Sequence, residues 1–241
     1  MPAFLLLLAA ALAAPAPAGT PVLVELFTSE GCSSCPPADR LLARLAAEQP
    51  VPGALVVPLA LHVDYWDRLG WKDPFSSAAF TARQSAYAER FGNAGRVYTP
   101  QMVVDGRAEF VGSDEKAARH AIEIAAKEPA AFVRVAPQGE GLRVTVAGAK
   151  AAANVVLAVT EDPPPSDVRR GENAGKRLSH VAVARELRTL GKTDTRGRFD
   201  GHASLPGLSP GGPRRVVAFA QEQISGRVLG VSPPVDLPAA R

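Results

Sequence analysis

Cysteine, methionine and tryptophan are scarce in this sequence: each occurs only twice in 241 residues, and aromatic residues make up 6%. Two cysteines are too few for a framework of several structural disulfides or for a zinc site built from thiolates alone. Two methionines exclude the methionine-rich clusters that often handle copper. The net charge is only +3, and basic residues are scattered except for the pairs Arg169–Arg170, Lys176–Arg177 and Arg214–Arg215. We therefore expect no nucleic-acid partner.

Long apolar runs are also missing beyond the N-terminus. The run at residues 3–14 is too short to span a bilayer of about 30 Å, so we expect no permanent membrane anchor. Small residues follow it, with competing Ala-x-Ala sites between Ala14 and Ala18, although no Lys or Arg precedes it. This arrangement indicates a signal peptide at residues 1–18 and a periplasmic or secreted protein. The oligomeric state cannot be predicted from any sequence feature.

The apolar periodicity predicts an α/β fold. Strand-like and helix-like segments follow one another from residue 21 to residue 127 in the order β-α-β-α-β-β-α. They are 21–27, 37–48, 54–63, 74–91, two strands within 101–111 around the turn pair Asp105–Gly106, and a helix with Ser113 as N-cap. Pro58 indicates a bulge or an edge position for the strand that contains it. This order is typical of a thioredoxin-like domain, which we place at residues 19–128.

The remainder of the chain is β-rich. Strand-like segments separated by glycine and proline turns occur at 132–136, 142–146, 154–160 and 215–221. We expect a sandwich-like C-terminal domain at residues 129–241.

The two cysteines stand three residues apart, between a predicted strand and a predicted helix. Unpaired N–H groups and the positive dipole end of a helix N-terminus stabilise a thiolate, so Cys32 should ionise below the pKa of about 8.5 of a free cysteine. Cys32 would attack a partner, and Cys35, which we expect to be the more buried, would resolve the mixed disulfide. Zinc binding, a purely structural bridge and two unrelated thiols are the alternatives. Zinc is disfavoured because four ligands are not grouped in the sequence.

Tyr98, Thr99 and Pro100 precede the predicted hairpin, where thioredoxin-like folds place a cis proline beside the reactive sulfur. Proline is the one residue at which a cis bond is cheap, so we predict a cis bond before Pro100. Tyr98 and Thr99 are then candidate substrate-binding residues. The alternative is an ordinary trans proline at the start of a strand.

Three further residues are candidates for proton transfer. His62 and Asp64 end the second predicted strand, and the carboxyl ends of parallel strands share one rim of the sheet with Cys32. His62 is also a candidate metal ligand, although a hydrogen-bonded structural role explains it equally well. Glu25 is a candidate proton acceptor for Cys35 if its side chain faces inward rather than toward solvent.

Several blocks resemble the DUF1223 family, a group of exported bacterial proteins of uncharacterised function classed as thioredoxin-like. The blocks run from Glu25 to Asp39, His62 to Asp67, Gly70 to Phe75, Arg83 to Gln84, Tyr98 to Gly106 and Arg170 to Lys176. The resemblance implies a redox site at Cys32, Cys35 and Pro100. Ala182–Arg185 departs from the Asn-Val-Val-Arg segment of the family pattern, which weakens any functional claim for the second domain.

Four residues in and after the last block form either a binding face or a polar loop held by its own hydrogen bonds: Arg170, Glu172, Asn173 and His180.

The function predicted from these features is a thiol-disulfide oxidoreductase, with exported thiol- or disulfide-containing proteins or small thiols as partners. We expect no cofactor and no metal beyond the redox-active disulfide Cys32–Cys35; the direction of exchange is not readable. The alternative is a non-enzymatic periplasmic binding or copper-handling module, in which His62 joins the cysteines. A thiol peroxidase is less favoured, because Thr28 and Arg40 are not in the arrangement that peroxidases use.

Overall fold

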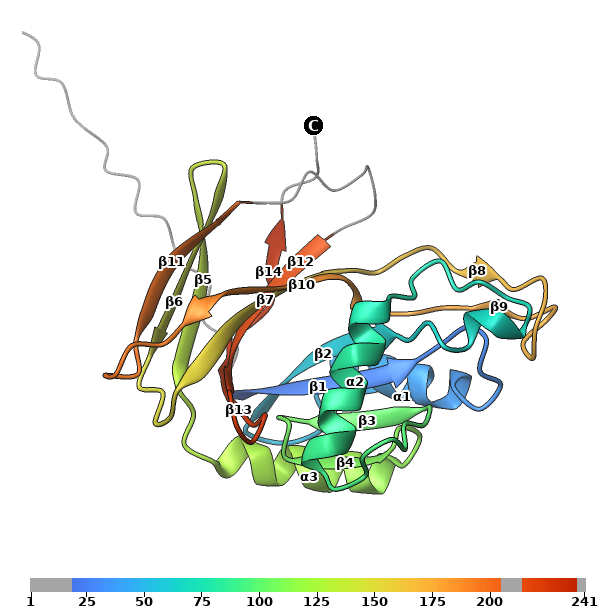
Figure 1. The fold of residues 1–241 in the computed structure, drawn as a ribbon, viewed down its shortest axis with the longest axis horizontal. Helices are drawn as coiled ribbons and strands as arrows, with labels where there is room; N and C mark the ends of the chain where they lie inside the picture. Colours follow the sequence, from blue (N-terminus) through green and yellow to red (C-terminus); the bar gives the residue numbers. More distant parts are fainter. Residues whose placement is uncertain (1–18, 205–213, 238–241) are drawn as a thin grey trace, which may run out of the picture.

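The computed structural model describes residues 19–204 and 214–237. The predicted signal peptide at 1–18 lies outside the described residues. The fold is mixed α/β and mostly sheet (Figure 1). The first part consists of β1 (Thr20–Thr28), α1 (Pro36–Glu48), β2 (Ala54–His62), a 3₁₀ turn η1 (Asp67–Leu69), α2 (Ala78–Arg90), β3 (Gln101–Val104), β4 (Ala108–Val111) and α3 (Glu115–Lys127).

The predicted order of strands and helices in this part is confirmed, with local corrections at two helix starts. α2 begins at Ala78 rather than at residue 74, because Ser77 is its N-cap and its side chain accepts a hydrogen bond from Ala79 N. α3 is capped by Asp114 rather than Ser113, and the Asp114 side chain accepts from Ala117 N. The hairpin between β3 and β4 turns at Asp105 and Gly106, both with positive φ, as a tight turn of this kind requires.

The later strands are β5 (Phe132–Gln138), β6 (Gly141–Ala147), β7 (Ala153–Glu161), β8 (Ser166–Asp167), β9 (Arg177–Leu178), β10 (Val183–Lys192), β11 (Phe199–Ser204), β12 (Arg214–Glu222), β13 (Val228–Val231) and β14 (Val235–Leu237). All four predicted strands of this part are present as β5, β6, β7 and β12. The longest unpredicted strand is β10. Charged residues interrupt its apolar pattern and two register shifts interrupt its pairing with β7.

Strands from both parts of the chain belong to one large sheet. Its order is β13-β12-β7-β10-β2-β1-β3-β4, with β14 also paired to β12. β2 pairs with β1 along nine residues but with β10 only at Ala60 and Val183, so most of β2 has one free edge, which accommodates Pro58. A separate sheet, β11-β6-β5, shares an apolar core with β7 and β12. The division into two domains stays a prediction.

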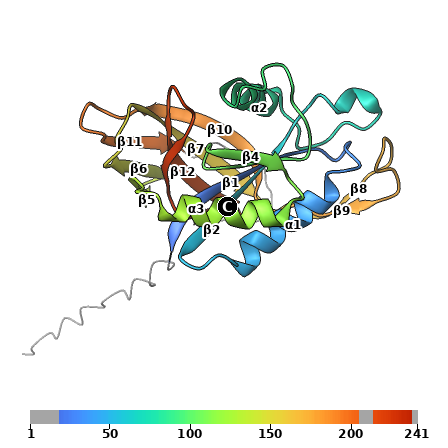
Figure 2. The ribbon, with the colours of Figure 1, turned by 90° about the horizontal axis from the view of Figure 1, so that it is seen from below.

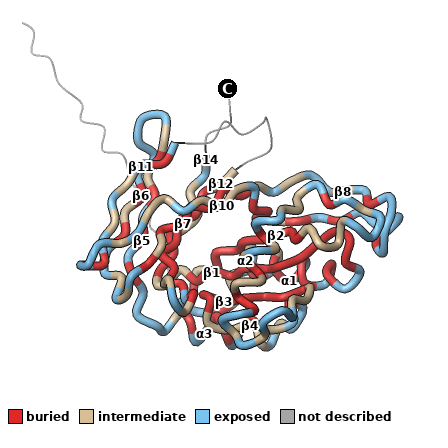
Figure 3. The backbone as a smooth tube through the Cα atoms, in the orientation of Figure 1, coloured by how far each residue is buried: buried red, intermediate tan, exposed pale blue. Residues whose placement is uncertain are grey.

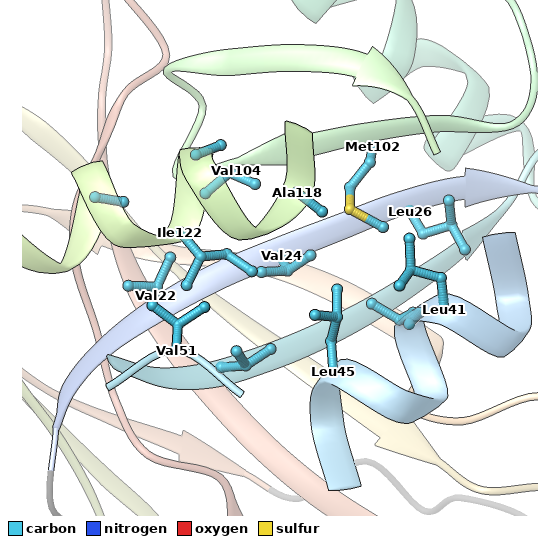
Figure 4. Packing of buried hydrophobic residues seen from close by; sticks show 14 of the residues in the cluster. Val22, Val24, Leu26, Leu41, Leu45, Val51, Met102, Val104, Ala118 and Ile122 are labelled. Atoms are coloured by element: carbon cyan, nitrogen blue, oxygen red, sulfur yellow. The ribbon is translucent and has the colours of Figure 1, made fainter. Parts of the chain in front are cut away.

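The two faces of β1 are covered by different helices. Val22, Val24 and Leu26 face α1 and α3, where Leu41, Leu45 and Ile122 pack against them (Figure 4). Leu23 and Phe27 point to the opposite face, into a core with Phe80 and Tyr87 of α2. Figure 2 shows α1 and α3 together on one side of the sheet and α2 on the other. Most residues of β1 and β2 are buried (Figure 3).

None of the helices in the described part of the chain is long and apolar enough to cross a membrane.

Candidate functional site

The two cysteines lie in the connection between β1 and α1. Cys35 is the N-cap of α1, and its carbonyl accepts hydrogen bonds from Ala38 N and Asp39 N. Cys32 is joined to it by a disulfide with the Cα atoms 5.4 Å apart. Pro36 and Pro37 occupy the first turn, where the missing N–H groups have no intrahelical acceptor to lose. A thiolate formed here would lie at the positive end of the α1 dipole.

Both cysteines are buried, with no exposed surface on either. The expectation that Cys35 is the more buried of the two is therefore wrong for the oxidised pair. Cys32 Sγ lies 3.3 Å from Ser34 Oγ. Reaction at Cys32 thus requires its surroundings to move.

The Thr99–Pro100 loop lies beside this connection. The Thr99–Pro100 peptide bond is cis, as predicted. Ser34 Oγ is 3.5 Å from the Thr99 carbonyl oxygen, and Trp66 Nε1 donates to Thr99 Oγ1 at 2.8 Å. Pro100 packs against Gly112, where an added Cβ would lie 3.1 Å from Pro100 Cβ and 3.2 Å from Ala38 Cβ of α1. The structure therefore brings Pro100 and Thr99 to the cysteine connection.

Tyr98 is oriented toward Glu109. Its hydroxyl donates to a Glu109 carboxylate oxygen, and its carbonyl accepts from Gln84 Nε2 at 2.7 Å. Burial raises the pKa of Tyr98, and the Glu109 carboxylate raises it further. Tyr98 supports the loop through these bonds, and its side chain is committed to Glu109.

Two carboxylates and a histidine are buried around the cysteine connection. Glu30 precedes Cys32 by two residues, Asp39 follows Cys35 by one helical turn, and His180 comes from the segment before β10. His180 Nε2 lies 3.4 Å from Glu30 Oε1, and His180 Nδ1 lies 3.8 Å from Asp39 Oδ1. Burial alone would lower the pKa of His180, but the Asp39 and Glu30 carboxylates outweigh it and raise that pKa to about 9. His180 is therefore a buried cation at neutral pH.

Each carboxylate of this cluster accepts a side-chain hydrogen bond at one of its two oxygens. Trp71 Nε1 donates to Glu30 Oε2 at 2.8 Å, and Thr28 Oγ1 donates to Asp39 Oδ1 at 2.9 Å. Glu30 Oε1 and both ring nitrogens of His180 have no hydrogen-bond partner among the described residues. The cluster has capacity for additional hydrogen bonds or protons.

His62 reaches the same cluster from the end of β2. Its Nδ1 is 2.7 Å from Asp73 Oδ2, its ring meets the His180 ring edge-on at 4.7 Å between centroids, and its Nε2 has no partner within the described chain. Asp73 Oδ2 also accepts from Glu30 N at 2.8 Å. Burial opposes ionisation of Asp73, but His62 and two backbone N–H donors lower its pKa. His62 is therefore linked to the cysteine connection through Asp73 and His180.

Asp64 and Glu25 lie away from this cluster. The Asp64 carboxylate accepts from Thr81 Oγ1 at 2.6 Å, which ties the end of β2 to α2. Glu25 lies on the face of β1 that carries Leu23 and Phe27, opposite α1. It is buried as predicted, but its oxygens accept from Arg83 Nε at 2.6 Å and Tyr87 Oη at 2.6 Å. The structure does not bring Glu25 to Cys35.

Two residues of the last block, Glu172 and Asn173, contact the cysteine connection directly. Asn173 Nδ2 donates to Glu30 O and to Cys32 O, both at 2.8 Å. Glu172 Oε2 accepts from Ser33 N at 3.0 Å and from Ser33 Oγ at 2.7 Å. These bonds cross between distant parts of the chain, so a loop held only by its own hydrogen bonds is the wrong interpretation. Arg170 is exposed.

Five residues of the site were not predicted from the sequence: Glu30, Asp39, Trp66, Trp71 and Asp73. The available signal was their occurrence inside the blocks shared with the family. For the described part of the chain, no group of three or more His, Cys, Asp and Glu residues is arranged to hold a metal ion.

Comparisons with known proteins show what this chain is similar to but establish no activity for it. A crystal structure of a protein from Agrobacterium tumefaciens, solved in a structural genomics programme, superposes with a TM-score of 0.72 at 26% identity, covering 92% of this chain and 96% of that one. The crystal structure of OgpA from Akkermansia muciniphila matches with a TM-score of 0.25 at 11% identity over 91% of this chain and 67% of that one, and carries no argument. None of the curated proteins matches. The model of the family described as "Protein of unknown function (DUF1223)" matches residues 23–221, so the chain belongs to the DUF1223 family.

Proposed function

We propose that this protein is an exported thiol-disulfide oxidoreductase that works through Cys32 and Cys35. The observation that carries the proposal is the position of the pair. It connects the end of β1 to the N-terminus of α1, with the cis peptide of Pro100 beside it. We further propose that residues 19–128 form a thioredoxin-like domain and that the β-rich remainder is sandwich-like.

The exchange follows from this position. A thiolate of the partner attacks Cys32 Sγ, the Cys32–Cys35 bond breaks, and Cys35 leaves as a thiolate. A second thiolate of the partner then attacks the partner sulfur that is bonded to Cys32 in the mixed disulfide. This forms the partner's disulfide and releases Cys32 as a thiolate. Two electrons pass from the partner dithiol to the pair, and the protons lost by the partner are available to the two cysteines. The same steps in reverse reduce a partner disulfide.

Two features of the site support Cys35 as the leaving thiolate. Cys35 is the N-cap of α1, so the positive end of the helix dipole stabilises negative charge on it. The buried His180 cation lies between Asp39, one turn beyond Cys35, and Glu30, two residues before Cys32. Partners of this chemistry are dithiols and disulfides of exported proteins or small thiols, with no cofactor beyond the pair itself.

The experiment is turnover in a disulfide-exchange assay with insulin as substrate and dithiothreitol as reductant. We expect the mature wild-type protein to accelerate insulin reduction and Cys32→Ser to lose the activity entirely. Ser33→Ala, which alters the same connection but keeps both sulfurs, should retain exchange. Wild-type and Cys32→Ser proteins with equal rates would rule out the proposed function. Copper that stays bound through gel filtration would instead support a metal-handling module.

A further inference from the structure

Residues 166–180, which we call the cap, lie over the cysteine connection. They comprise β8, β9 and the turn between them, followed by the approach to His180. In both ribbon views the cap lies at the same end of the molecule as the segment between β1 and α1 (Figures 1 and 2). Cys32, predicted to attack partners, has no exposed surface beneath this arrangement.

The cap is a weakly built element. β8 and β9 have two residues each and pair as Ser166 with Leu178 and Asp167 with Arg177. Two further backbone hydrogen bonds, Val168 N to Lys176 O and Gly175 N to Val168 O, continue the hairpin. Most of the cap is exposed (Figure 3), and its buried residues are Val168, Asn173, Leu178 and His180. A segment with so few buried apolar contacts opens at low cost compared with the core.

Asn173 is the main polar anchor of the cap. Its side chain is completely buried, and its single amide group donates to two carbonyls of the cysteine connection, Glu30 O and Cys32 O. The bonds of Glu172 to Ser33 are exposed to solvent and therefore contribute less. Asn173 is in turn oriented by Lys176, whose Nζ donates to Asn173 Oδ1 at 2.8 Å.

We propose that Asn173 is a specificity-determining residue of the redox site, because it holds the cap over Cys32 and so restricts which thiols reach that sulfur. The proposal rests on the proposed function. A small dithiol needs only a slight displacement of the cap, whereas a folded protein must displace the whole of it before its thiolate meets Cys32 Sγ. Asn173 acts through the position of the cap and takes no part in the exchange itself.

Loss of the Asn173 amide should therefore change rates selectively. Without it, Glu30 O and Cys32 O keep no bond to the cap and are better solvated when the cap opens. Two hydrogen bonds of ordinary net strength correspond to an increase of about thirtyfold in the open population. The increase should appear fully in reaction with a folded dithiol protein and only in part with a small dithiol.

The test is stopped-flow reduction of the oxidised full-length mature protein by reduced thioredoxin and by dithiothreitol, with products followed by alkylation and mass. We expect Asn173→Ala to react about thirtyfold faster than wild type with thioredoxin and to show a smaller acceleration with dithiothreitol. Asn154→Ala on β7, the same deletion far along the chain from the site, should match wild type. Equal rates for Asn173→Ala and wild type, or equal acceleration by both reductants, would overturn the proposal.

A second variant, Glu172→Ala, tests the proposal if Asn173→Ala folds poorly. Glu172→Ala removes the two exposed bonds to Ser33 and should speed hydrogen exchange of the Ser33 amide and reaction with thioredoxin, leaving the core amides protected. No acceleration there would contradict the role of the cap. If the wild-type pair exchanges readily and the cap variants react at the same rate as wild type, the role of the cap is wrong and the proposed function stands. If the pair exchanges in neither the wild type nor any variant, the proposed function is wrong as well.

Discussion

Two buried ionic groups flank the central sheet, and they differ in how completely they are satisfied. On the α2 face, Glu25, Arg83, Tyr87 and Gln221 form a closed set in which each buried polar atom has a partner, including bonds of 2.6 Å from Arg83 and from Tyr87 to Glu25. At the cysteine connection, His180 lies among Glu30, Asp39 and His62, and four buried nitrogen or oxygen atoms have no hydrogen-bond partner in the described structure.

The difference separates a structural role from a chemical one. A closed set of charges fixes packing and has little freedom to exchange protons, because every donor and acceptor is already used. An open set beside a disulfide costs stability and persists where function requires it. The perturbed ionisations agree with this division. Glu25 raises the pKa of Arg83 beyond its ordinary value despite burial. The pKa of His180 moves to about 9, a pH that ordinary buffers reach.

Breaking the closed set should have the larger effect on stability. Arg83→Met keeps much of the side-chain volume but leaves the Glu25 carboxylate buried without its cation. We expect a loss of roughly 3–5 kcal/mol in the free energy of unfolding, measured by urea denaturation with the disulfide intact. The exchange rate of the folded fraction should not change, since Glu25 faces away from α1.

The double variant Glu25→Leu with Arg83→Met is the control for the closed set. Because it removes both charges, it should recover part of the lost stability. If Arg83→Met instead slowed disulfide exchange while leaving stability unchanged, Glu25 would regain a role in proton transfer and the comparison would fail.

Breaking the open set should have a smaller effect that depends on pH. The pKa of His180 is raised in the folded protein, so its contribution is fully present below the unfolded value near 6.5 and is lost as the pH rises through about 9. In total this contribution is roughly 3 kcal/mol. The stability difference between wild type and His180→Gln should therefore be largest near pH 6 and shrink by about that amount by pH 10.

The groups that face His180 are Glu30, Asp39, the His62–Asp73 pair and Phe75, with Arg185 beyond the Phe75 ring. Asp73→Asn alters the neighbouring His62–Asp73 pair and keeps His180, so it serves as a comparison variant for the pH series. Stability curves of wild type and His180→Gln that run parallel from pH 6 to pH 10 would show that His180 is not the buried cation.

Features encoded by neighbouring residues were predictable from the sequence. The position of the cysteines between a strand and a helix, the hairpin at Asp105–Gly106 and the cis bond before Pro100 each depend on a few adjacent residues, and the structure contains all three. The face of Glu25 was not predictable, because alternation along a strand defines two faces without saying which helix covers each.

Features that depend on distant contacts were missed. Asn173 bonds to Cys32 across 141 positions of sequence, and Glu172 bonds to Ser33 across 139. β10 enters the large sheet beside β2 through a single register pair, Val183 with Ala60. Nothing in the local pattern of β8 and β9 indicates that they cover the cysteines, since strands of two residues leave almost no periodicity to detect.

The equilibrium reduction potential of the Cys32–Cys35 pair tests the central claim most directly. The protein is equilibrated in glutathione or dithiothreitol buffers, and the two thiols are counted by mass after alkylation. We predict a single two-electron transition between about −270 and −120 mV, the range of working redox pairs. A pair that stays oxidised well below about −300 mV, or that never forms the bridge, would contradict the claim and assign the cysteines a structural or metal-binding role.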